Sequence, residues 1–342
     1  MTMKICVIST TINVPTVFEL YRALDVEIEI IVTGDHKTPA AEAEKMLHAV
    51  GGRYLDVAAQ EALGSVSSPI IGWNTIRRRN IALLEAIRSK PDVIVTVDDD
   101  NIPIGRDYFD VLRAKFEAPF DGVTVNGKLG WFDAGMLLEP QTPHRGFPYS
   151  KRHIDLGLSF GHVTGARVGV VAGLWLGDPD IDAATRIVNA PQVRNFSELA
   201  RSGLAVKPGC FTPFNSQNTA FRADLAPLMA CWIQVGRYDD IWAAYLAQRV
   251  MMESGDHVLF GPPYVWQERN VHNLLRDLKD EIYGMETTDR FVQDLMSLDL
   301  GSGTVVDKMR NGYRQLQNKD YIPEPMRKFG LAWCEDVENA LQ

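Results

Sequence analysis

Cysteine is scarce in this sequence, and its placement predicts neither a metal motif nor a redox motif. The four cysteines (Cys6, Cys210, Cys231 and Cys334) form no CxxC pair and have no zinc-ligand spacing. This pattern favours buried thiols in a reducing compartment.

Long apolar runs and an excess of positive charge are also missing. No stretch approaches the roughly 20 apolar residues that a membrane span needs, and the N-terminal segment has no long apolar core or small-residue cleavage site. Lysine and arginine number 35 against 44 aspartates and glutamates, a formal net charge of −9. That balance argues against sequence-independent nucleic-acid binding, although a local basic patch can still hold phosphates. We expect a cytoplasmic protein with no membrane span and no nucleic-acid partner, and the sequence leaves a homo-oligomer open.

Two nucleotide-binding fingerprints are absent as well. No GxGxxG follows the first predicted strand, where residues 9–13 are Ser-Thr-Thr-Ile-Asn. Residues 122–128 match GxxxxGK, but Leu129 stands where a P-loop has its magnesium-binding Ser or Thr, and no helical pattern follows. A dinucleotide Rossmann site and a P-loop are therefore disfavoured, and without a flavin fingerprint no flavin is expected.

The first half of the chain alternates between strand and helix patterns. Short β-branched apolar runs predict buried strands at residues 5–9, 28–33 and 93–97. Helical patterns lie between them, at residues 16–24, 40–50 and 75–88. This alternation predicts an α/β fold with a mostly parallel sheet flanked by helices.

After residue 120 glycine and proline become frequent. Strand-like pieces occur at residues 168–176 and 211–221, and a helix is predicted over 240–252. From residue 271 onward the pattern is helical, with breaks expected near Gly284, residues 301–303 and residues 323–325. We therefore expect one catalytic domain over 1–300, with a nucleotide-binding half (1–120) and a sugar or acceptor half (121–300), followed by a helical C-terminal region over 301–342.

The strongest local signal is the acidic triplet Asp98-Asp99-Asp100, directly after a predicted strand. Carboxylates at the C-terminal edge of an open α/β sheet lie where such folds bind ligands. Clustered like charges favour a cation, and hard oxygen ligands suit Mn²⁺ or Mg²⁺, which commonly also hold substrate phosphates. The alternative is a solvated acidic turn that caps a helix near Gly105.

Further candidates are weaker. Asp239 and Asp240 open a predicted amphipathic helix and are either simple helix caps or a base or nucleophile near a sugar. Arg77-Arg78-Arg79 and Arg145 are either a diphosphate clamp or solvated basic residues. His257 and His272 could complete a metal shell, although a lone histidine is more often structural.

Several motifs, in order and with matching spacing over about residues 90–300, resemble the reversibly glycosylated polypeptides, the UDP-arabinopyranose mutases best known in plants. The matching segments are Val97-Asp98-Asp99-Asp100 with Ile102-Pro103, Arg145-Gly146-Phe147-Pro148-Tyr149-Ser150, Gly173-Leu174-Trp175-Leu176 with Pro179-Asp180-Ile181-Asp182-Ala183, Asn218-Thr219-Ala220-Phe221-Arg222, Asp239-Asp240-Ile241-Trp242 and Gly261-Pro262-Pro263-Tyr264-Val265-Trp266.

The resemblance implies a glycosyltransferase-A-like fold, a divalent metal and a UDP-sugar substrate. It implies that Asp100 binds the metal that bridges the diphosphate, with His272 as a second candidate ligand, and that Asp98 lies toward the ribose. The remaining positions expected at the nucleotide-sugar are Asp99, Arg77, Arg78, Arg145, Asn218, Trp175 and Trp266.

The family interconverts the pyranose and furanose forms of UDP-arabinose and glycosylates itself on an arginine. Here that segment is Val193-Arg194-Asn195-Phe196-Ser197, with Arg194 beside the glycosylated position and not at it, which argues against self-glycosylation. The polar residue after the family's tryptophan is Gln267.

These observations together predict a metal-dependent UDP-sugar pyranose–furanose mutase. The anomeric C–O bond would break while the metal and arginines absorb charge on the diphosphate, and Asp239 or Asp240 would stabilise the sugar cation or relay a proton. Two alternatives remain open: a glycosyltransferase that moves the sugar to an acceptor, and a non-catalytic UDP-sugar-binding partner in glycan or antibiotic assembly.

Overall fold

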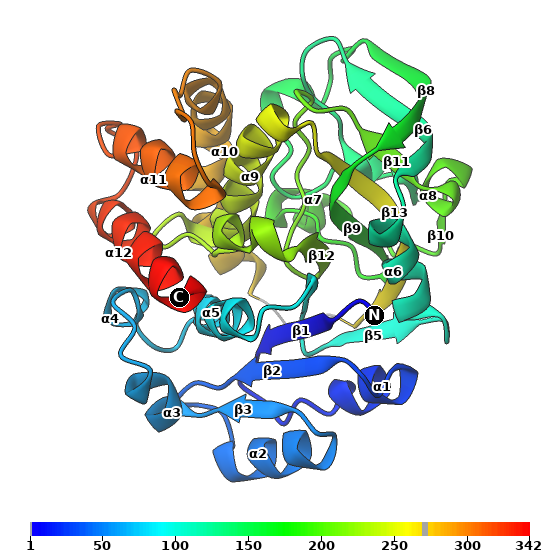
Figure 1. The fold of residues 1–342 in the computed structure, drawn as a ribbon. Helices are drawn as coiled ribbons and strands as arrows, with labels where there is room; N and C mark the ends of the chain where they lie inside the picture. Colours follow the sequence, from blue (N-terminus) through cyan, green and yellow to red (C-terminus); the bar gives the residue numbers. More distant parts are fainter. Residues whose placement is uncertain (1, 269–272) are drawn as a thin grey trace.

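The computed structural model describes residues 2–268 and 273–342, which form one large mixed sheet with helices on both faces (Figure 1). The strand order is β3-β2-β1-β4-β12-β9-β13-β11-β6-β8, and β5 pairs with β13 beside this path. The predicted α/β fold, with its helix-flanked sheet and helical C-terminal region, is confirmed.

The first half of the chain builds the parallel end of the sheet. Its strands are β1 (Ile5–Thr10), β2 (Glu29–Thr33), β3 (Arg53–Leu55) and β4 (Val93–Val97). Its helices are α1 (Val17–Leu24), α2 (Ala40–Ala49), α3 (Val57–Ala62), α4 (Ser68–Ile71), the 3₁₀ helix η1 (Ile76–Arg78) and α5 (Arg79–Ser89). Both faces of β4 are buried, which explains its unbroken apolar sequence. The helix predicted over residues 75–88 is divided into η1 and α5.

Strand directions alternate beyond β4. The further strands of the large sheet are β5 (Asn101–Ile104), β6 (Phe120–Gly127), β8 (Leu158–Ala166), β9 (Val168–Gly177), β11 (Leu204–Val206), β12 (Asn218–Arg222) and β13 (His257–Gln267). The β12 strand is antiparallel to both β4 and β9, whereas β9 runs parallel to β13. The strand predicted over residues 211–221 begins only at Asn218, and the β13 strand was not expected.

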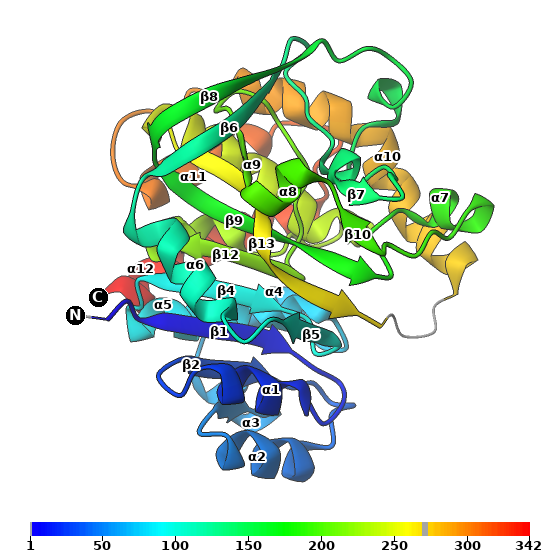
Figure 2. The same ribbon diagram turned by 90° about the vertical axis from the view of Figure 1, so that its right-hand side faces the viewer.

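Short helices and two short strands connect the strands of the large sheet. They are α6 (Tyr108–Glu117), η2 (Ala134–Leu137), β7 (Leu138–Glu139), η3 (Tyr149–Lys151), α7 (Ala183–Val188), β10 (Asn195–Phe196), α8 (Glu198–Ser202), η4 (Ala223–Met229) and η5 (Gly236–Tyr238). Figure 2 shows α1 and α6 on one face of the sheet, with α5 and the C-terminal helices on the other.

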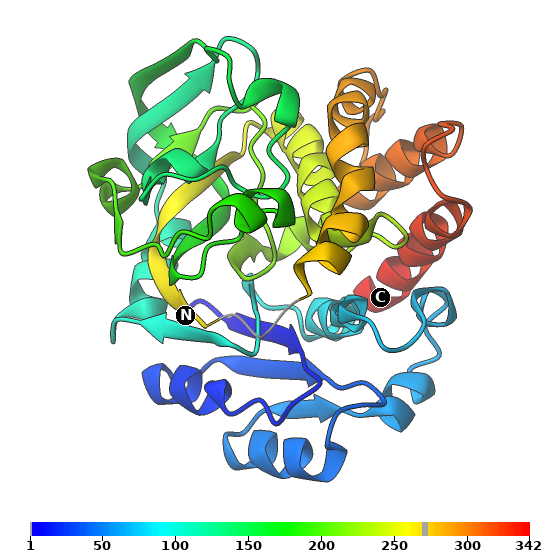
Figure 3. The ribbon, with the colours of Figure 1, turned by 180° about the vertical axis from the view of Figure 1, so that it is seen from behind.

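Four helices form the layer seen from behind in Figure 3: α9 (Asp239–Ser254), α10 (Leu274–Met296), α11 (Val305–Leu316) and α12 (Glu324–Leu341). The breaks predicted at residues 301–303 and 323–325 are confirmed, because Thr304 caps α11 through a capping box and Pro323 precedes α12. No helix in the described part of the chain is both long and apolar enough to cross a bilayer.

The C-terminal helices share the core of the sheet domain. Trp333 is fully buried, and its indole nitrogen donates to the Pro227 carbonyl at 2.7 Å. On the same helix, Asp336 accepts hydrogen bonds from the Ser65 hydroxyl and from the backbone N–H groups of Val66 and Ser67 at 2.6–2.8 Å. The last helix is thereby tied to the loop that precedes α4.

The break predicted at Gly284 is wrong, since α10 runs through it. A Cβ at Gly284 would lie 2.1 Å from the Tyr238 ring, so the glycine permits close packing of α10 on η5 and does not end the helix. Gly312 of α11 offers a contrast, because a Cβ there would make ordinary contacts of 3.4 Å or more.

Gly284→Ala is therefore expected to lower the free energy of unfolding by about 1–3 kcal/mol through overpacking. The matched change Gly312→Ala should be neutral or stabilising, because alanine has the higher helix propensity. Urea unfolding followed by circular dichroism measures both. Equal effects of the two substitutions would contradict the packing argument.

Candidate functional site

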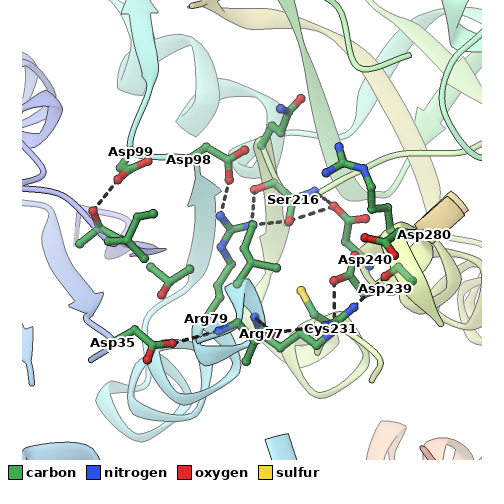
Figure 4. A pocket seen from close by; sticks show the side chains of 18 of the residues that line it. Asp35, Arg77, Arg79, Asp98, Asp99, Ser216, Cys231, Asp239, Asp240 and Asp280 are labelled. Atoms are coloured by element: carbon green, nitrogen blue, oxygen red, sulfur yellow. Dashed lines mark hydrogen bonds and ion pairs between the residues drawn. The ribbon is translucent and has the colours of Figure 1, made fainter. Parts of the chain in front are cut away.

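A cavity of about 1080 Å³ lies at the edge of the sheet where β1, β2 and β4 end. Its volume is at the upper limit of the roughly 300–1,000 Å³ common for ligand pockets. The segment before β12, the first turn of α9 and the N-terminal half of α10 complete its walls, as Figure 4 shows for part of the lining. Segments far apart in the sequence therefore meet at the edge where open α/β sheets bind ligands.

All three carboxylates of the acidic triplet line this cavity. The Arg79 guanidinium donates to Asp98, and the Thr11 hydroxyl donates to Asp99. Burial raises the pKa of Asp99. The side-chain amide of Gln267 donates to Asp100 at 3.3 Å. Each member of the triplet thus has its own set of neighbours.

Asp239 and Asp240 begin α9 and face the same cavity from another side (Figure 4). Burial raises the pKa of Asp239, and Asp240 adds to the rise, while the Arg77 guanidinium at 3.2 Å opposes it. Asp240 accepts two hydrogen bonds on one oxygen, from the backbone N–H and the hydroxyl of Ser216, each at 3.0 Å. The two adjacent aspartates therefore have different environments.

The three consecutive arginines point in different directions. Arg77 and Arg79 line the cavity, but Arg78 is buried away from it, 3.8 Å from the Trp73 ring and donating to Gln60 at 2.8 Å. Burial lowers the pKa of Arg78 to about 10. Successive helical residues are rotated by about 100°, so three adjacent side chains cannot share one face. Arg78 is thus placed as part of the core beneath the cavity, not beside the phosphates as expected.

Arg145 also lines the cavity and forms a buried, two-pronged ion pair with Asp180 at 2.7 and 2.9 Å. Burial alone would lower the pKa of Arg145, but Asp180 and Asp240 hold it well above its usual value. Burial alone would likewise raise the pKa of Asp180, but Arg145 holds it well below its usual range. Arg77, Arg79 and Arg145, the expected arginines that line the cavity, are therefore each already paired with a carboxylate.

The lining as a whole is acidic. Among the described residues it contains eight aspartates and six lysines or arginines. An anionic ligand would be repelled by this balance unless a cation accompanied it.

The triplet supplies suitable oxygen donors for such a cation. No group of three or more His, Cys, Asp or Glu side chains forms a metal-binding cluster within the described ranges. Mg²⁺ and Mn²⁺ are commonly held by one or two carboxylates, with waters and substrate phosphates completing the shell. The carboxylates of Asp98 and Asp100, with the Gln267 amide beside them, fit that arrangement.

Of the residues that the structure describes, several expected at the nucleotide-sugar or metal do not line the cavity: Trp175, Asn218, Trp266 and His257. Trp266 and Gln267 are adjacent on β13, and alternation along a strand explains why only Gln267 reaches the cavity. His257 begins β13, so it lies at the far end of that strand from Gln267. His272 lies outside the described residues.

Two of these motif residues, Trp175 and Asn218, form hydrogen bonds that hold the cavity wall in place. The Trp175 indole donates to the side-chain oxygen of Gln217 at 2.6 Å, and Gln217 itself lines the cavity. The side-chain amide of Asn218 donates to the Pro263 carbonyl at 3.0 Å and joins β12 to β13. Their place in the structure is to hold the strands and loop that form the cavity floor.

Sequence reasoning missed other lining residues. Asp180, Ser216 and Gln217 lie in or directly before matched motifs, so the motif positions could have indicated them. Lys279, Asp280 and Tyr283 come from α10 and carry no local signal. Asn74 and Gln234 also line the cavity with left-handed backbone (φ 58° and 59°), a strain typical of ligand sites.

Removing Arg145 would leave Asp180 with only the Asn215 amide, at 2.7 Å, as a remaining close partner among those described. Arg145→Gln is expected to lower the free energy of unfolding by about 3–5 kcal/mol near neutral pH, because a buried charge loses its counterion. Since the pKa of Asp180 is depressed in the intact protein, the ion pair stabilises above the unfolded-state pKa near 4 and is lost as pH falls further. The difference between the two proteins should therefore shrink in acid.

Denaturant unfolding at several pH values measures this effect. The control is Arg290→Gln, which removes an exposed ion pair with Asp320 and should cause no measurable change. A difference that stays constant down to low pH would contradict the assignment.

Comparison with known proteins places this geometry in context. UDP-arabinopyranose mutase 3 of Arabidopsis thaliana is 30% identical over 186 residues, covering 48% of each chain. UDP-arabinopyranose mutase 1 of Oryza sativa subsp. japonica is 33% identical over 147 residues, 41% of this chain and 36% of that protein. Probable UDP-arabinopyranose mutase 4 of Arabidopsis thaliana is 28% identical over 242 residues, 67% of this chain and 61% of that protein.

The matched part of the chain spans about half the length of the first of these relatives. A family described as "Reversibly glycosylated polypeptide" matches residues 140–318, more than half of the sequence, including Arg145, Asp180, Ser216 and the Asp239–Asp240 pair. The chain therefore belongs to the reversibly glycosylated polypeptide family.

Proposed function

We propose that this protein is a metal-dependent UDP-sugar mutase that interconverts pyranose and furanose forms. The observation that carries the proposal is that the acidic triplet and the Asp239–Asp240 pair line two sides of one cavity with room for a nucleotide-sugar (Figure 4). The names of the relatives support the same activity.

Metal dependence follows from the charge of the cavity. A diphosphate carries negative charge into a lining whose described residues include more aspartates than lysines and arginines. Asp98 and Asp100 would hold Mn²⁺ or Mg²⁺, which supplies positive charge to the diphosphate and stabilises it as a leaving group. Arg77, Arg79 and Arg145 line the same space, and their remaining N–H groups would contact phosphate oxygens.

The proposed reaction needs no co-reactant. UDP leaves with the electron pair of the anomeric C–O bond. Another hydroxyl of the sugar then forms a bond to the anomeric carbon, and the bond from that carbon to the former ring oxygen breaks. The proton of that hydroxyl passes to the former ring oxygen, and the diphosphate oxygen then attacks the anomeric carbon again. Asp239, whose pKa is raised by burial, suits proton transfer, and a carboxylate of the pair stabilises the cationic sugar. No flavin takes part.

A cytoplasmic location is part of the same proposal. All four cysteines are buried and form no disulfide, which supports a reducing compartment.

The proposed metal site at Asp100 can be tested by substitution. Asp100→Asn should weaken Mn²⁺-dependent UDP binding by roughly 2–4 kcal/mol, because a charged ligand to a hard cation is lost. Isothermal titration calorimetry with and without Mn²⁺ measures it. The exposed Asp110→Asn serves as a control and should bind like wild type. Equal affinity of all three proteins with and without metal would overturn the assignment.

The mutase assignment makes the second prediction. With Mn²⁺ and a UDP-pentopyranose, the purified protein should form a UDP-furanose without any acceptor. Replacing the critical member of the Asp239–Asp240 pair by Asn should lower turnover by roughly 10²–10⁴-fold while UDP binding persists, the usual scale for a positioned acid–base group. NMR of the products and calorimetry of UDP binding provide the two measurements.

Other outcomes assign other functions. Transfer of label to an added acceptor without isomerisation would make the protein a glycosyltransferase. UDP binding without metal-dependent turnover across a panel of UDP-sugars would make it a binding partner. Loss of UDP binding along with turnover would place the aspartate pair at the nucleotide or metal.

A further inference from the structure

Ser216 joins charged groups from two sides of the cavity. Its hydroxyl lies 3.0 Å from Asp240 and also contacts the Arg79 guanidinium, which in turn contacts Asp98 (Figure 4). A guanidinium only donates and a carboxylate only accepts. The Ser216 hydroxyl must therefore accept from Arg79 and donate to Asp240, which fixes the direction of every hydrogen bond in the chain.

This contact fixes the orientation of the Asp240 carboxylate. Its Oδ2 accepts from both the backbone N–H and the hydroxyl of Ser216. Its Oδ1 is buried, lies 3.5 Å from Arg145, and finds no hydrogen-bond donor among the described residues. Within the described part of the chain, the long Arg145 contact is thus the only close compensation for this oxygen, so its negative charge is weakly balanced and would stabilise a positive charge in the adjacent cavity.

Asp239 is more closely paired. Its Oδ1 accepts from the Asp240 backbone N–H at 3.1 Å, and its Oδ2 lies 3.2 Å from the Arg77 guanidinium. Both of its oxygens therefore lie closer to a donor or a cation than Oδ1 of Asp240 does. The two aspartates differ in what they can offer a sugar.

We propose that Ser216 is a positioning residue that fixes the Asp240 carboxylate at the cavity wall, so that the negative charge of Asp240 and not that of Asp239 stabilises the cationic anomeric centre. This inference rests on the proposed function and deepens it. The same hydroxyl links Asp240 through Arg79 to Asp98, so the sugar end and the diphosphate end of the cavity share one hydrogen-bonded chain.

The first test separates positioning from folding and binding. Ser216→Ala should lower kcat for isomerisation about tenfold, the effect of one lost hydrogen bond of about 1.4 kcal/mol, while UDP affinity stays within about twofold. Ser216→Thr keeps the hydroxyl and should recover most of the rate. In an Asp240→Asn background, Ser216→Ala should cause no further loss, because the two side chains act as one unit. The exposed Ser202→Ala is the matched control.

The second test does not need turnover. A five-membered iminosugar, whose ring nitrogen is protonated, is titrated into protein with UDP and Mn²⁺ beside its neutral tetrahydrofuran analogue. Wild type and Asp239→Asn should prefer the cation by about tenfold or more, whereas Asp240→Asn should lose the preference and Ser216→Ala should reduce it.

The outcomes of the two tests are distinguishable. If no UDP-sugar is isomerised but the iminosugar pattern holds, the mutase function fails and the role of Ser216 stands. If isomerisation occurs and Ser216→Ala matches wild type in both tests, the role of Ser216 is overturned. Loss of the cation preference in Asp239→Asn alone would overturn the choice of Asp240.

Discussion

The cavity brings eight aspartates to one edge of the sheet, and their mutual repulsion is the constraint on which the surrounding structure depends. Arginines answer it in pairs: Arg79 with Asp98, Arg145 with Asp180 and Arg77 with Asp239. The Arg77–Asp239 pair joins the first half of the chain to the second, and Arg145 and Asp180 are 35 residues apart. The charges of the site are therefore neutralised only when the chain folds and brings these segments together.

Pairing with carboxylates changes how the cavity arginines can bind an anion. An exposed guanidinium could meet a phosphate with its full charge, but a buried one already bound to a carboxylate offers only directed N–H groups. In this protein Arg145 is the clearest case, since Asp180 occupies two of its donors. In the proposed function, recognition of the diphosphate would then depend on directed N–H groups from the arginines and on positive charge from the metal ion, so different groups would perform the two tasks.

The sequence alone was sufficient for the features that depend on local pattern. The buried strand before Asp98, the helix that begins at Asp239 and the α/β alternation all follow from periodicity and composition, and the structure confirms them. The sequence was insufficient for features that depend on the direction of a side chain. Arg78 and Trp266 are each adjacent to a cavity residue but point elsewhere, because helical rotation and strand alternation separate neighbours. The lining residues from α10 could not be predicted for another reason, because only tertiary packing brings that helix to the cavity.

The hydrogen bonds from residues 65–67 to Asp336 have a consequence for the order of assembly during synthesis. The loop they hold leads into α4, which is followed by η1 and α5, the elements that carry Arg77 and Arg79. These bonds cannot form until residue 336 has left the ribosome, more than 250 residues after the loop itself. The wall that bears the two arginines thus gains its last anchor late in translation, long after the acidic triplet opposite it has been made.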